Sequence, residues 1–271
     1  MKKTNLKYVL IPAFAATAFL PILDNSNSAK ANDEITTEST SQNLVSSNAS
    51  SVNNKEVTNK LPLSLVEYKQ KSALELAKLI REKKVTSTEL VDLAYKVIEE
   101  ENKKLNAVLT TENGKIPQAI VDEAYKEAKE IDNRISAGNA AANPINWEEQ
   151  PFLGVPTLIK GLDQIKNGDA SNGVYFNKNK VSKSDLIVAK EFKKLGFVIL
   201  GQTNYPELGT RNITDSKLFG PAGNPWDSTR NAGGSSGGSA SAVSSGMVAI
   251  ASGSDAGGSI RIPASWTGLI G

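Results

Sequence analysis

The chain has 271 residues, which is enough for one large domain or two small ones. Its 39% hydrophobic and 22% charged residues are ordinary for a globular protein. Because the chain contains no cysteine and no histidine, disulfides, a cysteine nucleophile and a Ser-His-Asp site are excluded, and no metal site is expected. Any nucleophilic chemistry must use a base other than histidine.

The N-terminus has the three parts of a secretory signal peptide. "MKKTNLK" is positively charged, "YVLIPAFAATAFLPIL" is apolar, and "SAKA" ends in a small-x-small pattern. We therefore expect residues 1–31 to be a signal peptide that is cleaved after Ala31, which predicts a secreted protein. The alternative is a retained membrane anchor, but Pro12 and Pro21 interrupt an apolar stretch that is short for a span.

Removing the signal peptide changes the charge balance. The formal net charge falls from +2 to −1, because 27 Lys and Arg residues then face 28 Asp and Glu residues. This balance gives no reason to expect a nucleic-acid partner. Membrane contact is expected only through the signal peptide.

Two further regions follow the signal peptide. Residues 32–61 are rich in Ser, Thr and Asn, which predicts a disordered spacer because such a composition buries too little apolar surface. Residues 62–271 are predicted to fold. Ser72 with Glu75, and Thr86 with Glu89, have the spacing of capping boxes at the starts of two helices.

Strands and helices then alternate along the chain. A further helix is expected from about Ile116 to Ile135, followed by a loop at 138–150. The segments "PFLGVPTLIK", "SDLIVAKEFKKLG", "FVILG" and "MVAIASGS" (247–254) predict a strand, a helix that Gly196 ends, and two buried strands. This alternation indicates an α/β protein in which helices cover a parallel or mixed sheet.

The segment "NAGGSSGGSASAVSSG", residues 231–246, has five glycines and six serines, a composition typical of a flexible linker. Its flanks argue against a linker. The apolar run 247–254 follows it, and then a second Gly-rich turn, "SGSDAGGSIRIPASWTG". Glycines in such turns let backbone N–H groups approach a substrate atom. We therefore interpret both segments as parts of a site.

These segments resemble the amidase signature family of serine hydrolases. The segment "GGSSGGSASAVSSGMVAIASGSDAGGSIRIPASWTGLIG" is similar to the family's signature. "FLGVPTLIKG", "VILGQTNYPELG" and "GPAGNPWDSTRNAGGSSGG" resemble further family blocks in the expected order, so the likeness covers most of residues 72–271. It implies the amidase-signature fold, a mixed β-sheet core covered by helices.

The resemblance implies a catalytic triad that needs no histidine. Ser259 in "GGSIRIP" matches the family's nucleophile, and Lys160 in "GVPTLIK" matches its base. Ser235 in "GGSSGG" matches the bridging serine, whose peptide bond with Gly234 is cis in the family. A buried lysine without a carboxylate partner has a lowered pKa and can act as a base. Ser235 would relay the proton from Ser259 to Lys160.

Other residues are expected to support this chemistry. The backbone N–H groups of Ala256, Gly257, Gly258 and Ser259 are candidates for an oxyanion hole. We expect Asp255 and Arg261 to pair, Ser236 to orient its neighbours, Thr203 and Asn204 to fix a loop, and Trp226 and Trp266 to lie in the core or a wall. No cofactor is implied.

The chain departs from the family pattern at two places. Many members have an acidic residue directly after the lysine, whereas this chain has Gly161, with Asp163 two positions later. The chain also ends at Gly271, twelve residues after Ser259, so we expect a fold truncated after the signature segment. A sheet that ends there is expected to expose an apolar edge, which predicts poor solubility and lost activity.

The sequence thus predicts a secreted amidohydrolase that cleaves a small-molecule or peptide amide through an acyl-serine intermediate. One alternative is an inactive truncated remnant. Another is an amidotransferase A-type subunit, against which the signal peptide argues because that complex is cytosolic. No residue identifies the substrate or the oligomeric state.

Overall fold

The computed structural model describes residues 62–138 and 144–271. Their helices are α1 (Leu65–Lys69), α2 (Ala73–Arg81), α3 (Ser87–Leu105), α4 (Gln118–Ala137), α5 (Ile187–Lys194), α6 (Gly237–Ser244) and α7 (Arg261–Thr267). The strands are β1 (Pro156–Lys160), β2 (Val198–Thr203), β3 (Gly223–Asn224) and β4 (Asp227–Asn231), and two 3₁₀ turns are η2 (Tyr175–Asn177) and η3 (Glu207–Gly209). The predicted signal peptide and spacer lie outside the described residues.

The central sheet is mixed. β1 and β2 pair in parallel, with Lys160 opposite Thr203. Val108 bridges Thr203 in the antiparallel sense on one side, and Ala251 bridges Leu158 in the parallel sense on the other. β3 and β4 form a separate antiparallel pair. The predicted α/β class with a mixed sheet and covering helices is confirmed.

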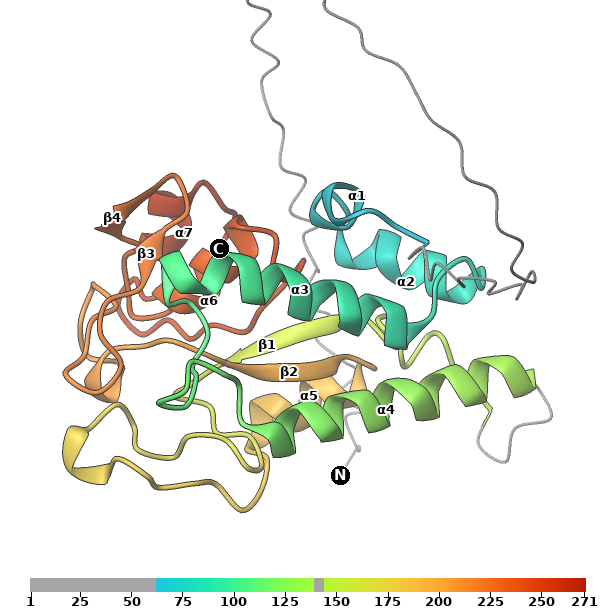
Figure 1. Ribbon diagram of the computed structural model, residues 1–271, viewed down its shortest axis with the longest axis horizontal. Helices are drawn as coiled ribbons and strands as arrows, with labels where there is room; N and C mark the ends of the chain where they lie inside the picture. Colours follow the sequence, from blue (N-terminus) through green and yellow to red (C-terminus); the bar gives the residue numbers. More distant parts are fainter. Residues whose placement is uncertain (1–61, 139–143) are drawn as a thin grey trace, which may run out of the picture. The chain divides into compact units, whose positions relative to one another are not determined.

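Side chains of β1 and β2 alternate between two apolar layers, as the two-residue period of a strand requires. Leu158 and Leu200 pack into the larger core with residues of α2, α3 and α6. Ile159 and Ile199 pack on the other face with Ile120 and with Ala189 of α5. Figure 1 shows α3 on one side of these strands and α5 on the other, while α4 runs beside β2 and contributes to both apolar layers. Burial on both faces explains why both strands are apolar runs.

Both predicted capping boxes are confirmed. The Ser72 side chain accepts from the Glu75 N–H and the Glu75 side chain accepts from the Ser72 N–H, at the start of α2. Thr86 and Glu89 make the same reciprocal pair at the start of α3. Helix α4 lies two residues later than predicted, because Pro117 occupies its N-cap. Gly196 follows α5 with a φ of 96°, as its predicted role in ending that helix requires.

Two expectations were wrong. Residues 247–254 form no regular strand but a single bridge to β1, where side chains replace part of the ladder: Thr157 Oγ1 donates to the Ile250 carbonyl and the Lys160 N–H donates to Ser252 Oγ. Trp226 and Trp266 are 70% and 50% exposed rather than buried. The Trp226 indole N–H donates to the Thr267 carbonyl, so this ring is fixed at the surface by its polar edge.

No helix among residues 62–138 and 144–271 is long and apolar enough to cross a membrane.

Candidate active site

Lys160 lies at the carboxyl end of β1 and is completely buried. Its Nζ donates to Ser235 Oγ at 2.8 Å and to Ser254 Oγ at 2.9 Å. Within the part of the chain that the structure describes, it forms no ion pair. A buried amine with hydroxyl partners and no ion pair is disfavoured in its charged form.

Burial is the main cause of a lowered Lys160 pKa, which falls from 10.5 to about 8. The negative charges of Asp163 and Asp255 act in the opposite direction and raise the pKa. The structure thus supports the predicted direction of the pKa shift, but the prediction omitted these two carboxylates. A lysine with a pKa near 8 has a substantial neutral fraction at mildly alkaline pH, and the neutral amine can accept a proton.

The Gly/Ser segment 231–246 is folded and largely buried, not a linker. Ser235 is 1% exposed and its peptide bond with Gly234 is cis. A side chain at Gly234 would lie 2.6 Å from the Ile213 backbone, so only glycine allows these two chain segments to approach so closely. Helix α6 begins directly after this turn, at Gly237.

Ser259 is brought to this turn through its backbone. The Ser236 N–H donates to the Ser259 carbonyl at 3.0 Å, and the Ser236 hydroxyl bonds to the backbone of Ser254. Ser236 thus orients both neighbouring loops, as predicted. Ser259 is half-buried, and its hydroxyl has no hydrogen-bond partner among the described residues. The structure joins Lys160 to Ser235, while the hydrogen bond between Ser235 and Ser259 that a relay needs is not formed.

Asp255 holds the loop that carries Ser259. Its carboxylate accepts from the Gly258 and Ile260 N–H groups at 2.6 and 3.0 Å. The Arg261 guanidinium donates two hydrogen bonds of 3.0 Å to the same carboxylate. The Arg261 contact, followed by the backbone N–H groups, lowers the pKa of Asp255 far below its usual range. The predicted pairing of Asp255 with Arg261 is confirmed.

The oxyanion-hole prediction needs a correction at Gly258. The Gly258 N–H already donates to the Asp255 carboxylate, and a hydrogen bond to a charged acceptor is stronger than one to a neutral acceptor. In the described structure, the N–H groups of Ala256, Gly257 and Ser259 make no hydrogen bond, so these three remain candidates.

Sequence reasoning missed Ser252 and Ser254, which bind Lys160 through its backbone N–H and its Nζ. Both lie in "SGSDAGG", where the sequence analysis considered Asp255 and the backbone of residues 256–258 but not the serines, so the hydroxyl-rich composition of this turn was an available signal. Asp163 was noted only as a departure from the family pattern. Its Oδ2 is buried and has no hydrogen-bond partner among the described atoms, and burial raises the pKa of Asp163.

Gly161 has a structural explanation. A Cβ at this position would collide with the Tyr205 ring and lie 2.8 Å from the Thr203 carbonyl, which accepts the Gly161 N–H at 2.9 Å. The buried Tyr205 therefore occupies the space of the side chain that many family members carry here. Tyr205 is fixed in turn by a hydrogen bond from its hydroxyl to Asp169.

Asn204 holds a loop, as expected, whereas Thr203 joins the end of β2 to α6. Thr203 Oγ1 shares a hydrogen bond of 2.6 Å with Ser239 Oγ, and Asn204 Nδ2 donates to the carbonyls of Asn106 and Gly220. Both side chains are completely buried. No cluster of acidic side chains suited to a metal ion occurs among the described residues.

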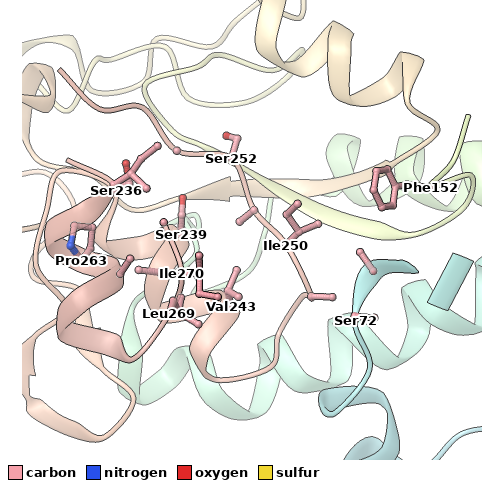
Figure 2. Close-up of a pocket in the computed structure, with 18 of the residues that line it drawn as sticks. Ser72, Phe152, Ser236, Ser239, Val243, Ile250, Ser252, Pro263, Leu269 and Ile270 are labelled. Carbon is pink, nitrogen blue, oxygen red and sulfur yellow. The ribbon is translucent and has the colours of Figure 1, made fainter. Parts of the chain in front are cut away.

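A mainly apolar cavity of about 280 Å³ adjoins the site. Figure 2 shows Ser236 and Ser239 at one side of it, Phe152 at the other, and Ile250 and Ser252 along the segment that follows α6. Leu269 and Ile270 also line it. The side chains of Lys160 and Ser235 are not part of its lining.

Comparison with known proteins identifies the family. A family model described as Amidase matches residues 89–271, and the chain belongs to the amidase signature family. It is 44% identical over 243 residues to a lipoamidase of Enterococcus faecalis, covering 86% of this chain and 30% of that protein. It is 38% identical over 200 residues to the A-type subunit of a glutamyl-tRNA(Gln) amidotransferase of Aromatoleum aromaticum, covering 74% of this chain and 37% of that protein.

A solved structure shows the same fold. The crystal structure of a bacterial aryl acylamidase of the amidase signature family superposes with a TM-score of 0.63 at 34% identity, covering 73% of this chain and 38% of that one. The chain thus spans about a third of the length of the relatives it matches.

Proposed function

We propose that the chain carries the catalytic triad of a secreted amide hydrolase, with Ser259 as nucleophile, Ser235 as relay and Lys160 as base. The observation that carries the proposal is the hydrogen bond of 2.8 Å between Ser235 and a fully buried lysine whose pKa is about 8. A lysine with a purely structural role would gain more from a carboxylate partner or from exposure to water.

Acylation begins from the neutral lysine. Rotation about χ1 of Ser259 directs its hydroxyl to Ser235 Oγ, while the Ser235 hydroxyl donates to Lys160 Nζ. As Ser259 Oγ bonds to the amide carbon, its proton passes to Ser235 and the Ser235 proton passes to Lys160. The carbonyl oxygen becomes an oxyanion, which accepts hydrogen bonds from the N–H groups of Ala256, Gly257 and Ser259.

The C–N bond then breaks, and the lysine returns its proton through Ser235 to the leaving amine. Water then attacks the acyl-Ser259 ester and gives a proton through Ser235 to Lys160. When the ester bond breaks, Lys160 returns this proton through Ser235 to Ser259 Oγ, which leaves as a hydroxyl. Asp255 and Arg261 keep the nucleophile loop in place but touch no reacting atom.

The relatives support an amide substrate, since their names denote lipoamidase and aryl acylamidase activities. The alternative is an amidotransferase A-type subunit, after the second relative. We favour the hydrolase because the signal-peptide pattern of residues 1–31 predicts export, with cleavage after Ala31. N-terminal sequencing of the protein from culture medium tests the export, which an intact Met1 in the membrane fraction would contradict.

A fluorophosphonate probe tests the triad without knowledge of the substrate. In a version of the protein that extends over the length of its relatives, the probe should label Ser259, and Ser259→Ala should abolish the labelling. Ser245→Ala is the matched control, because Ser245 belongs to the same Gly/Ser segment and its hydroxyl donates to the Ala242 carbonyl, away from the triad. Hydrolysis of lipoamide and of an aryl acylamide is measured alongside. An adduct at Ser235 or Ser236 would overturn the assignment, and a folded chain that is neither labelled nor active would favour the inactive remnant.

A further inference from the structure

The segment between β1 and α5 carries an exposed apolar and cationic tip. An antiparallel bridge between Asp169 and Val181, with a hydrogen bond from the Ala170 N–H to the Lys180 carbonyl, closes the segment like a hairpin. The turn η2 lies between these two arms. Figure 1 shows this yellow segment as a long excursion from the sheet, with the short helical turn at its outer end.

Of the two aromatic residues of η2, Phe176 is almost uncovered, and Tyr175 is partly covered and borders a cavity. Phe176 is 96% exposed and Tyr175 is 45% exposed, and Val181 in the adjoining arm is 60% exposed. Phe176 is the most exposed of the three. Covering such a large apolar side chain with an apolar phase lowers the free energy, because apolar surface is removed from water.

Lysines surround these apolar side chains. Residues 166–183 contain four lysines and one aspartate, a net charge of +3 in a chain whose total is +2. Lys178 and Lys217 place Nζ 5.4 and 5.0 Å from the centre of the Tyr175 ring. Lys178, Lys180 and Lys217 carry no ion pair in the described structure. Their charge is therefore available to an anionic partner.

We propose that this tip, defined by Tyr175, Phe176, Lys178, Lys180, Val181 and Lys217, docks on the surface of an anionic lipid bilayer. Phe176 enters the boundary between headgroups and acyl chains, and the lysines contact anionic headgroups while their aliphatic stems cover apolar surface. A folded protein partner would need a wider complementary surface than one protruding turn offers. The proposal adds a membrane contact to the one expected from the signal peptide and does not depend on the amidase activity.

The absence of cysteine allows a direct test on the full chain. Phe176→Cys, labelled with an apolar polarity-sensitive fluorophore, reports the environment of the tip. Val66→Cys is the control, since Val66 is 65% exposed in α1. Vesicles of equal parts phosphatidylglycerol and phosphatidylcholine should shift the emission of the label at 176 to the blue, and that shift should disappear in high salt or with phosphatidylcholine alone. The label at 66 should not shift.

The lysines are tested in the same labelled background. Replacing Lys178, Lys180 and Lys217 by Gln should weaken partitioning onto anionic vesicles by about tenfold or more. Replacing Lys78, Lys103 and Lys104 by Gln removes the same charge elsewhere and should leave partitioning onto anionic vesicles unchanged. The N-terminal apolar segment is present in every variant, so its contribution to vesicle binding cancels when variants are compared.

Three results would overturn the proposal: no shift at 176, equal shifts at 176 and 66, or a shift that neutral vesicles also produce. A shift with polyglutamate but not with vesicles would likewise overturn it, in favour of an acidic polypeptide.

Discussion

Two titratable residues of the candidate site, Lys160 and Asp255, have opposite kinds of surroundings. Lys160 is buried, has only hydroxyl and carbonyl partners, and its pKa is lowered to about 8. Asp255 is surrounded by hydrogen-bond donors and a guanidinium, and its pKa is also lowered, but by partners that stabilise its charge. A lowered pKa favours the neutral form of a lysine but the ionised form of an aspartate. Burial therefore makes Lys160 suited to act as a base, whereas hydrogen bonding keeps Asp255 charged and suited to brace the loop.

The largest expected effect comes from removing the base. Lys160→Ala should slow the labelling of Ser259 by a fluorophosphonate about 10²–10⁴-fold, which is the usual contribution of a general base. Arg261→Ala, which removes only the brace, should slow it much less. Stopped-time labelling of both variants, with circular dichroism to check folding, makes the comparison. Equal losses in the two variants would contradict the division into base and brace.

The second prediction concerns stability and pH. Lys160 titrates near pH 8 when folded and near 10.5 when unfolded, so between these values the unfolded chain binds more protons. The free energy of unfolding of the wild type, relative to Lys160→Met, should therefore rise by about 3 kcal/mol from pH 8 to 10.5. The difference should level off below about pH 7, where Lys160 is protonated in both states. Denaturant unfolding of both proteins across this range measures it, and a flat difference would mean that burial does not perturb the lysine.

Asp163 tests how the lysine is tuned. Its charge raises the Lys160 pKa against the effect of burial. Asp163→Asn should therefore lower that pKa, and the alkaline rise in the rate of Ser259 labelling should move to lower pH. Asp122→Asn, on exposed surface of α4, is the control and should leave the profile in place. A shift to higher pH would show that Asp163 acts in another way.

The smallest effect is expected at the brace. The stabilisation that Asp255 provides should be present above the pKa of about 4 of a carboxylate in the unfolded chain, and should fade as the pH falls below that value. Asp255→Asn should thus reduce thermal stability modestly at neutral pH, and by less in acid. An equal loss at pH 7 and pH 3, measured by thermal unfolding, would contradict the role of its charge.

The sequence predicted much of this arrangement, because local signals were strong. The capping-box hydrogen bonds of Ser72 and Thr86 form within the first turn of each helix, so they depend on local sequence alone. The short apolar runs of β1 and β2 are typical of strands that are buried on both faces. The segment 247–254 was misjudged because its pairing depends on side chains of β1 rather than on its own apolar pattern.

The site was predicted less completely than the fold. The family pattern pointed to Lys160, Ser235 and Ser259 as a triad, but it could not reveal that the Gly258 N–H donates to the Asp255 carboxylate. The Ser254 contact to Lys160 and the Tyr205 ring above Gly161 also depend on three-dimensional neighbours that no spacing encodes.

The central claim is that burial makes Lys160 a base, and a direct titration tests it. The protein is labelled with ¹³C at lysine Cε, and the Lys160 signal is assigned by its disappearance in Lys160→Met. The account predicts that this signal titrates near pH 8, well below the ordinary lysine pKa of about 10.4. A Lys160 signal that titrates at or above pH 10 would contradict the account.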